Sequence, residues 1–328
     1  MLIDGFGRVG RDLRVSLTDR CNLRCSYCMP VEGLPWLPQP EILTDDEVVR
    51  LVRVAVSLGI TAVRFTGGEP LLRPGLVNIV RAVSALGNAP RLSVTTNGIG
   101  LAELAPELRA AGLERINISL DTLKPEVFKA ISHRDRLDDV LAGLDAAQRA
   151  GLRPVKVNAV LLRGINDTEA ADLLEYCLAR DFDLRFIEQM PLDPQHGWRR
   201  EQMITAEEIL DQLRRRWRIE PDQNELRGSA PAELFVIDGG SARVGIIASV
   251  TKPFCADCDR VRLTADGALR TCLFAQSETD LRTQLRAGAT DVELAATFRR
   301  AMLGKKAGHG IGEPDFDQPA RPMSAIGG

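Results

Sequence analysis

The stretch Cys21-Asn-Leu-Arg-Cys25-Ser-Tyr-Cys28 carries three cysteines in the spacing C-x3-C-x2-C, with an aromatic residue just before the last one. Three thiolates on one short loop can hold three irons of a cubane iron–sulfur cluster, and the fourth iron then keeps an open position. A zinc site or a disulfide is the alternative, but zinc usually takes four ligands and disulfide frameworks are typical of short secreted chains. The stretch therefore favours a cluster that binds a small molecule at its open iron.

Short β-branched segments alternate with amphipathic helical segments from about residue 12 to residue 220. Such alternation predicts a parallel sheet, either an open doubly wound sheet or a barrel. About six β/α units fall short of the eight in a closed barrel, so we expect an α/β fold with an incomplete (β/α)6 TIM-like barrel. The active site should lie at the C-terminal ends of the strands. The predicted strands are residues 13–17, 62–66, 91–95, 115–120, 155–160 and 184–188, and the predicted helices are 46–58, 76–86, 101–111 and 137–150.

The pattern changes after about residue 220. Two short strands are expected at residues 235–237 and 243–247, followed by helical segments at 279–286 and 291–303. From Gly304 the chain becomes rich in glycine and proline and ends in Gly327-Gly328. We therefore expect two regions, a barrel over residues 1–220 and a C-terminal extension over residues 221–328.

A second cysteine triplet lies in this extension, as Cys255-Ala-Asp-Cys258 followed by Cys272. Its spacing, C-x2-C-x13-C, again offers three thiolates, which predicts a second iron–sulfur cluster with an open iron that could bind substrate. A zinc ribbon that lacks a fourth ligand is the alternative. The seventh cysteine, Cys177, stands alone in a helical segment and is expected to be a buried apolar residue.

Composition limits the remaining possibilities. The 328 residues are 45% hydrophobic and 27% charged, which suits a full core, and the net charge of −3 offers no global attraction for nucleic acid. No apolar run is long enough to span a membrane, and the first residues lack the apolar core of a signal peptide. We therefore expect a cytoplasmic protein. The histidines are His133, His196 and His309, too few to favour a histidine-based metal site.

Thr66-Gly-Gly-Glu-Pro70 closes the second predicted strand. Its glycines permit close approach of the backbone to a ligand, and Glu69 could accept a hydrogen bond from an ammonium group. The alternative is a plain tight turn. One strand after the cysteine loop, the segment favours a place in the same site.

Several cations lie in segments predicted to be extended. Arg260 and Arg262 are two residues apart, so their side chains point to the same side of a strand, and guanidinium groups suit phosphate oxygens. Arg14, Arg64 and Lys156 have apolar neighbours, where a cation is costly unless paired. For an isolated arginine pair a solvated charged edge is the alternative. Beside a cluster, these residues predict a site for a phosphate-bearing substrate.

Taken together, these motifs resemble the radical S-adenosylmethionine (SAM) enzymes, and within them the family of GTP 3′,8-cyclase, molybdenum cofactor biosynthesis protein A. Radical SAM membership rests on the first triplet and the segment from Thr66 to Pro70. The cyclase likeness runs from Leu13 through Gly328 and rests on the second triplet, the Arg-Val-Arg run and the terminal Gly-Gly.

The resemblance implies a role for each matching residue. Two [4Fe–4S] clusters are implied, the first on Cys21, Cys25 and Cys28 and the second on Cys255, Cys258 and Cys272. The implied SAM contacts are Tyr27, Gly68, Ser119 and Met190. The implied GTP contacts are Arg14, Arg64, Thr95, Lys156, Arg260 and Arg262. Gly327 and Gly328 match a flexible terminus that reaches into the active site and is needed for activity.

The resemblance also implies a reaction and partners. A 5′-deoxyadenosyl radical made from SAM takes hydrogen from C3′ of the GTP ribose, and C3′ then joins C8 of guanine. The implied partners are a flavodoxin-like reductant, a downstream cyclic pyranopterin monophosphate synthase and a second copy of the chain, with no nucleic acid and no membrane. A peptide-modifying radical SAM maturase and a zinc-binding nucleic-acid module are the alternatives, although maturases tend to carry more C-terminal cysteines and the charge disfavours the module.

Overall fold

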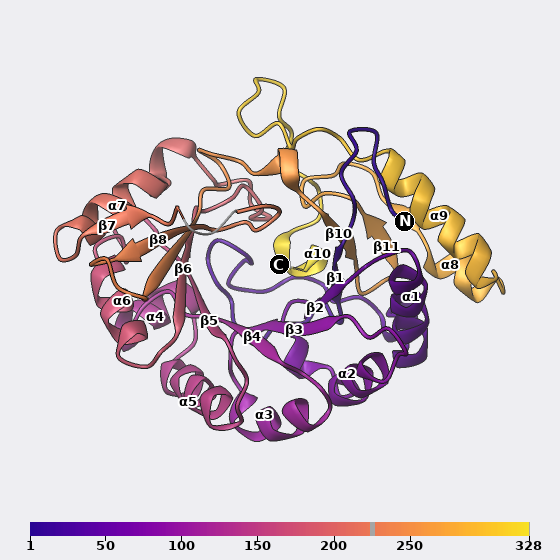
Figure 1. Ribbon diagram of the computed structural model, residues 1–328, viewed down its shortest axis with the longest axis horizontal. Helices are drawn as coiled ribbons and strands as arrows, with labels where there is room; N and C mark the ends of the chain where they lie inside the picture. Colours follow the sequence, from indigo (N-terminus) through magenta and orange to yellow (C-terminus); the bar gives the residue numbers. More distant parts are fainter. Residues whose placement is uncertain (224–226, 328) are drawn as a thin grey trace.

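The computed structural model describes residues 1–223 and 227–327. Within them, the strands form one continuous sheet in the order β12-β11-β10-β1-β2-β3-β4-β5-β6-β9-β8-β7. Figure 1 shows this sheet curving into an incomplete ring with helices around its outside. The fold is mixed α/β.

The strands at the centre of this order are parallel. They are β1 (Asp12–Ser16), β2 (Ala62–Thr66), β3 (Arg91–Thr96), β4 (Arg115–Ser119), β5 (Val155–Val160) and β6 (Asp183–Ile187). Each pairs in parallel with the next, which agrees with the six predicted β/α units, and every predicted strand lies within one or two residues of an observed one. Parallel pairing places the C-terminal ends of all these strands at one edge of the ring, where the site is built.

The C-terminal part of the chain extends this sheet at both of its ends. β10 (Arg260–Leu263) pairs in parallel with β1, and β9 (Arg243–Ile247) pairs in parallel with β6. The outer strands are antiparallel: β11 (Ala268–Arg270) and β12 (Thr279–Asp280) beyond β10, and β8 (Glu233–Ile237) and β7 (Ile219–Pro221) beyond β9. The division near residue 220 stays a prediction, but residues beyond it supply parallel strands on both sides of the six.

The helices cover the outside of the ring (Figure 1). They are α1 (Asp45–Ser57), α2 (Leu76–Ser84), α3 (Leu101–Ala110), α4 (Pro125–Ser132), α5 (Leu137–Arg149), α6 (Ala170–Leu178), α7 (Ala206–Arg214), α8 (Arg282–Arg286), α9 (Asp291–Leu303) and α10 (Met323–Ile326). Capping boxes open α1, α7 and α9, where a threonine side chain accepts from the backbone of a glutamate three residues on. None of the described helices is long and apolar enough to cross a membrane.

One predicted helix differs from the structure. Residues 279–286 do not form a single helix, because Thr279 and Asp280 form β12 and the helix α8 begins only at Arg282. The carboxylate of Asp280 accepts hydrogen bonds from the backbone and hydroxyl of Thr283, at 3.0 and 2.5 Å. Pairing with β11 holds the first two residues extended, and the side chain of Asp280 starts the helix after them.

Alternation along the strands separates the core from the interior of the ring. In β1 the residues Leu13 and Val15 are fully buried in the core, whereas Arg14 between them is only partly buried. The same alternation places Val63 in the core and Arg64 opposite to it. Successive residues of a strand point to opposite faces, so aliphatic side chains pack under the helices and polar side chains face inward. The interior of the ring is therefore the polar face on which a site can form.

Candidate active site

The first cysteine triplet lines a cavity of about 170 Å³ near the C-terminal ends of the strands. The loop that carries these cysteines follows β1, and backbone hydrogen bonds hold it in place. The N–H of Arg24 donates to the carbonyl of Ser132 at the end of α4, at 2.9 Å. The N–H of Cys28 donates to the carbonyl of Cys25 at 2.8 Å, which closes a tight turn between two of the cysteines. All three thiols therefore face one cavity.

The surroundings of these thiols keep them protonated. Burial raises the pKa of Cys21 to about 11 and that of Cys28 to about 12. Burial also raises the pKa of Cys25, and the nearby carboxylate of Asp121 adds to the effect. Thiols with such pKa values bind metal only by releasing their protons. Three thiols on one cavity are the donor set of an iron–sulfur cluster, and in this respect the loop fits one.

Gly67 and Gly68 line the same cavity. A Cβ on Gly67 would lie 2.5 Å from the carbonyl oxygen of Thr18, and one on Gly68 would lie 2.4 Å from that of Arg20. Gly67 also has a φ of +156°. Close approach of the loop after β1 therefore requires both glycines, whatever ligand the cavity binds.

Glu69 is fully buried beside this cavity and holds two loops together. Its carboxylate accepts hydrogen bonds from the N–H of Leu71, the hydroxyl of Thr96 and the N–H of Asn97, at 2.9, 2.7 and 2.7 Å. Burial raises the pKa of Glu69 to about 7, although these three hydrogen bonds oppose the shift. The donors occupy most of the acceptor capacity of the carboxylate, which leaves little of it for an ammonium group.

Tyr27 and Asp121 form a hydrogen-bonded pair between the first cavity and a second one. The Tyr27 hydroxyl donates to Asp121 at 2.7 Å, and the other oxygen of Asp121 accepts from the N–H of Val160 at 2.9 Å. Burial raises the pKa of Asp121 to about 6. Residues that line both cavities are Tyr27, Thr95, Ser119, Asp121 and Met323. The two cavities are therefore neighbours.

The second cavity, of about 270 Å³, is lined by the other cysteine triplet and by arginines. Cys255, Cys258 and Cys272 all reach it from segments that flank β10 and β11. The predicted substrate residues that line it are Arg14, Arg64, Thr95, Arg260 and Arg262. The sheet register explains why three of these arginines meet, because Arg14 pairs with Arg262 on β10 and with Arg64 on β2.

Asp12 on β1 is an acid whose charge acts on Arg14, Arg64 and Arg262. Burial, reinforced by repulsion from its neighbours, lowers the pKa of Arg14 well below its ordinary value and that of Arg262 to about 10. Among the described residues, the buried Nε atoms of Arg14, Arg64 and Arg260 have no hydrogen-bond partner. Arg260 also lies over the ring of Phe254, with its guanidinium carbon 4.6 Å from the ring centroid. Guanidinium groups whose buried Nε donors lack a partner fit a polyanionic ligand.

Two further cations, Lys305 and Arg8, donate hydrogen bonds to backbone carbonyls of the second cysteine loop. Lys305 is 4% exposed, and its ammonium donates to the carbonyls of Cys258 and Arg260 at 2.9 and 2.8 Å. It also lies 3.6 Å from the sulfur of Cys258. Arg8 donates to the carbonyl of Cys255. Burial alone would raise the pKa of Cys258. The positive charges of Lys305 and Arg260 oppose this effect, and the pKa of the thiol lies below its ordinary value.

Four further predicted site residues are Met190, Lys156, Gly327 and Gly328. Met190, a predicted SAM contact, lines the second cavity. Lys156 lines a third cavity of about 430 Å³, where its ammonium lies 3.6 Å from Asp183. Arg185 lines both the second and third cavities. Gly327 has a φ of +90° and its carbonyl accepts from Arg262, whereas Gly328 lies outside the described residues.

Sequence reasoning missed several residues of the site. Asp121 follows Ser119 in the run Ile-Ser-Leu-Asp, so its position after a predicted strand could have indicated it. His309 lines the second cavity with its Nε2 3.1 Å from the carbonyl of Ser249, although its sequence context is that of a loop. No pattern in the sequence around Lys305 indicates that it lies in the site. Among the described residues, no three His, Cys, Asp or Glu side chains already form a metal-binding group.

Comparison with known proteins adds two family models and many relatives. The model described as "Radical SAM superfamily" matches residues 15–177, and the model described as "Molybdenum Cofactor Synthesis C" matches residues 182–311. A GTP 3′,8-cyclase of Streptomyces coelicolor is 64% identical over 329 residues, covering 100% of this chain and 96% of that protein. A GTP 3′,8-cyclase 2 of Mycobacterium tuberculosis is 57% identical over 332 residues, covering 100% of this chain and 92% of that protein.

A solved structure agrees at the level of the fold. The crystal structure of Streptococcus suis SuiB superposes with a TM-score of 0.60 at 14% identity, covering 96% of this chain and 76% of that one. The parallel sheet with a three-cysteine loop after its first strand defines a radical SAM enzyme, and that superfamily implies SAM and a [4Fe–4S] cluster. At 57% to 64% identity over its full length, the chain belongs to the GTP 3′,8-cyclase family of molybdenum cofactor biosynthesis.

Proposed function

We propose that this protein converts GTP and SAM to (8S)-3′,8-cyclo-7,8-dihydroguanosine 5′-triphosphate, an early step of molybdenum cofactor biosynthesis. One observation carries the proposal: a cavity with three thiols adjoins a cavity that combines three further thiols with Arg14, Arg64 and Arg260, whose buried Nε atoms have no hydrogen-bond partner. The first set suits a radical SAM cluster, and the second suits a nucleotide with a polyphosphate. The names of the full-length relatives agree with this substrate.

In this proposal the first cavity holds SAM and its cluster. Cys21, Cys25 and Cys28 are the cluster ligands, and Tyr27, Gly68 and Ser119 bind SAM from the walls of that cavity. When bound and reduced, the cluster with SAM supplies a 5′-deoxyadenosyl radical that abstracts the hydrogen at C3′ of the ribose. The hydrogen-bonded pair of Tyr27 and Asp121 lines both this cavity and the substrate cavity.

The substrate cavity must instead bind the negatively charged triphosphate of GTP. Arg14, Arg64 and Arg262 lie side by side on neighbouring strands and would bind the triphosphate through charge-assisted hydrogen bonds. Thr95 lines both cavities and would contact GTP where the two meet. Lys156 and Met190 keep their proposed roles with GTP and SAM, although the first lines the third cavity and the second lines the substrate cavity. Holding C3′ close to C8 is the main contribution expected of these residues, because positioning accounts for much of the rate of a ring closure.

A second [4Fe–4S] cluster on Cys255, Cys258 and Cys272 belongs to the proposal. The three thiols line the substrate cavity itself, and Lys305 provides a buried positive charge beside one of them. A thiolate-bound cluster with an open iron could contact the guanine directly. Gly327 and Gly328 are proposed to act at the same place, because the carbonyl of Gly327 already accepts a hydrogen bond from Arg262.

The remaining parts of the proposal rest on the family alone. A flavodoxin-like protein would supply the electron, and a cyclic pyranopterin monophosphate synthase would consume the product. A homodimer in the cytoplasm is the proposed working form.

The test is an anaerobic assay of protein reconstituted with iron and sulfide. With SAM and GTP deuterated at C3′, we expect the cyclised nucleotide by mass spectrometry and deuterium transfer into 5′-deoxyadenosine. About eight irons per chain would accompany full activity, since two cubanes are proposed. Cleavage of SAM without cyclised product, in protein with both clusters loaded, would contradict the proposed substrate.

A further inference from the structure

The C-terminal segment enters the ring from outside and has little structure of its own. After α9 ends at Leu303 the chain returns toward the sheet, and Figure 1 shows α10 inside the ring near β1 and β10. The helix α10 has only four residues, far fewer than the ~12–15 that an isolated helix needs in water. Its position must therefore come from contacts with the rest of the protein.

Two such contacts lie at the very end of the segment. Ile326 is 1% exposed and belongs to a small apolar cluster with Leu192, Val250 and Ile311. The next residue, Gly327, presents its carbonyl to Arg262 on β10. A Cβ on Gly327 would lie 2.6 Å from the hydroxyl of Thr66, so the end of the segment fits closely against β1 and β2.

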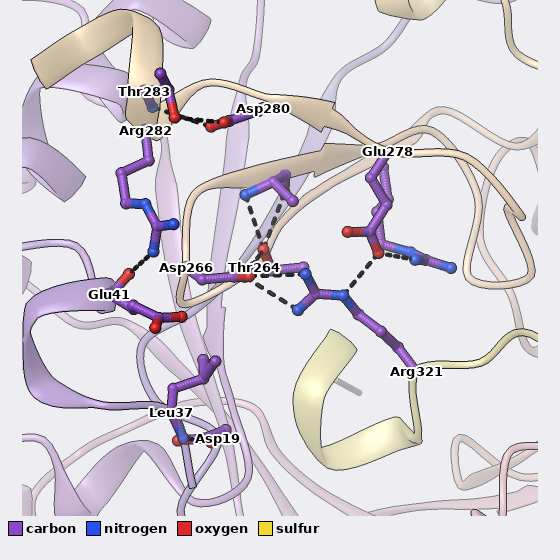
Figure 2. Close-up of polar contacts among 12 residues, drawn as sticks. Asp19, Leu37, Glu41, Thr264, Asp266, Glu278, Asp280, Arg282, Thr283 and Arg321 are labelled. Atoms are coloured by element: carbon purple, nitrogen blue, oxygen red, sulfur yellow. Dashed lines mark hydrogen bonds and ion pairs between the residues drawn. The ribbon is translucent and has the colours of Figure 1, made fainter. Parts of the chain in front are cut away.

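A third contact lies before α10 and is ionic. Arg321 uses all the nitrogens of its guanidinium group (Figure 2). Its Nη1 and Nη2 bind both oxygens of Asp266, at 3.1 and 2.7 Å, and its Nε binds Glu278 at 2.8 Å. The side chains are 27%, 14% and 23% exposed for Arg321, Asp266 and Glu278, so the group is only partly screened by solvent.

Both carboxylates are held in place by other residues. Asp266 lies in the turn between β10 and β11 and accepts a hydrogen bond from the hydroxyl of Thr264 at 2.5 Å. Glu278 also pairs with Arg270, whose side chain is 3% exposed. The turn belongs to the same hairpin that carries Arg262. Asp266 therefore lies on the hairpin of the proposed substrate cavity, and Glu278 lies beside it, just before β12, which pairs with β11.

We propose that Arg321 is a positioning residue whose ion pairs with Asp266 and Glu278 fasten the C-terminal segment so that Gly327 reaches Arg262. The inference rests on the proposed function, because it assigns Arg321 a role in placing the terminal glycines of that active site. A lysine cannot replace it, since a single ammonium cannot match the planar fork that binds both oxygens of one carboxylate and a second acid.

The test compares Arg321→Ala and Arg321→Lys with a matched control, Arg282→Ala. Arg282 lies close by, as Figure 2 shows, but donates to the backbone carbonyl of Glu41 and not to the C-terminal segment. Hydrogen–deuterium exchange of residues 322–327 is measured in protein without added iron or SAM, and cyclisation kinetics are measured in loaded protein. A double variant, Asp266→Asn with Glu278→Gln, removes the same ion pairs while leaving Arg321 in place.

We expect faster exchange of residues 322–327 and a lower kcat in both Arg321 variants and in the double variant, with iron content unchanged. The control should behave like the wild type. Rising salt should speed exchange of this segment in the wild type but have little further effect in Arg321→Ala, a dependence that a purely packing role would not show.

Unchanged exchange in Arg321→Ala would overturn the proposal, as would a lower kcat while the segment stays protected. Failure of the proposed function is recognised separately. A wild type that cleaves SAM without making the cyclised nucleotide would refute the function and with it the catalytic role of these ion pairs, whereas the exchange data still report whether Arg321 holds the segment.

Discussion

The two cysteine triplets are alike in number of thiols and opposite in surroundings. Cys21, Cys25 and Cys28 lie on one loop, beside the carboxylates of Glu69 and Asp121. Cys255, Cys258 and Cys272 come from both sides of the β10–β11 hairpin and lie among cations. Burial raises the pKa of Cys28 to about 12, whereas Lys305 and Arg260 bring that of Cys258 below its ordinary value.

This difference in charge explains how one ring can bind two different ligands in two neighbouring cavities. SAM carries a sulfonium and an ammonium group. The first cavity suits these cations better than the second, because Asp121 lines it and, among the described residues, no arginine does. GTP carries several negative charges, and the neighbouring cavity is lined by Arg14, Arg64 and Arg260, whose buried Nε atoms have no hydrogen-bond partner. Since oppositely charged surroundings favour different ligands, each one should bind poorly in the other's place.

The largest effect is expected from removing a thiol of the first triplet. Cys25→Ala should abolish SAM cleavage and cyclisation together, because the radical source is lost. Cys177→Ala is the matched control, since Cys177 is buried away from both cavities in α6. Iron analysis and 5′-deoxyadenosine formation check this, and substantial SAM cleavage by Cys25→Ala would remove the first triplet from the radical chemistry.

Removing a thiol of the second triplet should separate the two activities. Cys258→Ala should lose about half of the iron, since one of two proposed cubanes is affected, and should lose cyclisation. Cleavage of SAM should persist, because Cys21, Cys25 and Cys28 are untouched. If the variant kept the iron content and cyclisation rate of the wild type, the two triplets would not both hold clusters.

The arginine row should determine affinity for GTP. Arg64→Leu removes a buried cation and should raise KM for GTP by roughly 10- to 100-fold, the loss expected for a charge-assisted hydrogen bond. Arg91→Leu is the control, because Arg91 is exposed at the start of β3. Steady-state kinetics check the prediction. Equal KM values for the two variants would place the triphosphate elsewhere.

Lys305 should affect the second triplet alone. Lys305→Met removes the buried charge beside Cys258 and should weaken iron binding there by about 10- to 100-fold, the usual effect of changing a residue that supports a metal ligand. Lys306→Met changes the exposed neighbouring lysine and should leave loading unchanged. Titration with chelator, followed by spectroscopy of each cluster, distinguishes the outcomes. Equal weakening of both clusters would indicate a general loss of stability.

The smallest effect concerns Lys156 and the stability of the protein in the absence of cofactors. Burial lowers its pKa from 10.5 to about 8, so between these pH values the unfolded state binds more protons than the folded state. The contribution of this residue to stability therefore rises with pH across that window. Lys156→Met should remove this part of the slope, and Lys129→Met, which changes an exposed lysine, should retain it. Urea unfolding from pH 7 to pH 11 makes the comparison, and identical slopes would mean that Lys156 is solvated.

Much of the fold and of the first cavity could be predicted because the relevant residues are close in sequence. The period-2 pattern of Leu13, Arg14 and Val15 is a local signal for a strand with one polar face. Residues 279–286 were mistaken for one helix because pairing with β11, a contact between segments, outweighed local propensity. Asp121 was missed although its strand was predicted, since which carboxylate meets Tyr27 depends on how two loops approach each other.

The sequence by itself determined the local chemistry: three thiols within one loop, the glycines after β2, and arginines alternating with aliphatic residues along strands. These features depend on spacing along the chain, which local backbone geometry converts directly into position. Only the tertiary structure decided that β10 lies beside β1, that Lys305 is buried behind Cys258, and that Arg321 meets Asp266. Such contacts join residues far apart in the chain, and they form only when the sheet curves and its layers pack into one core.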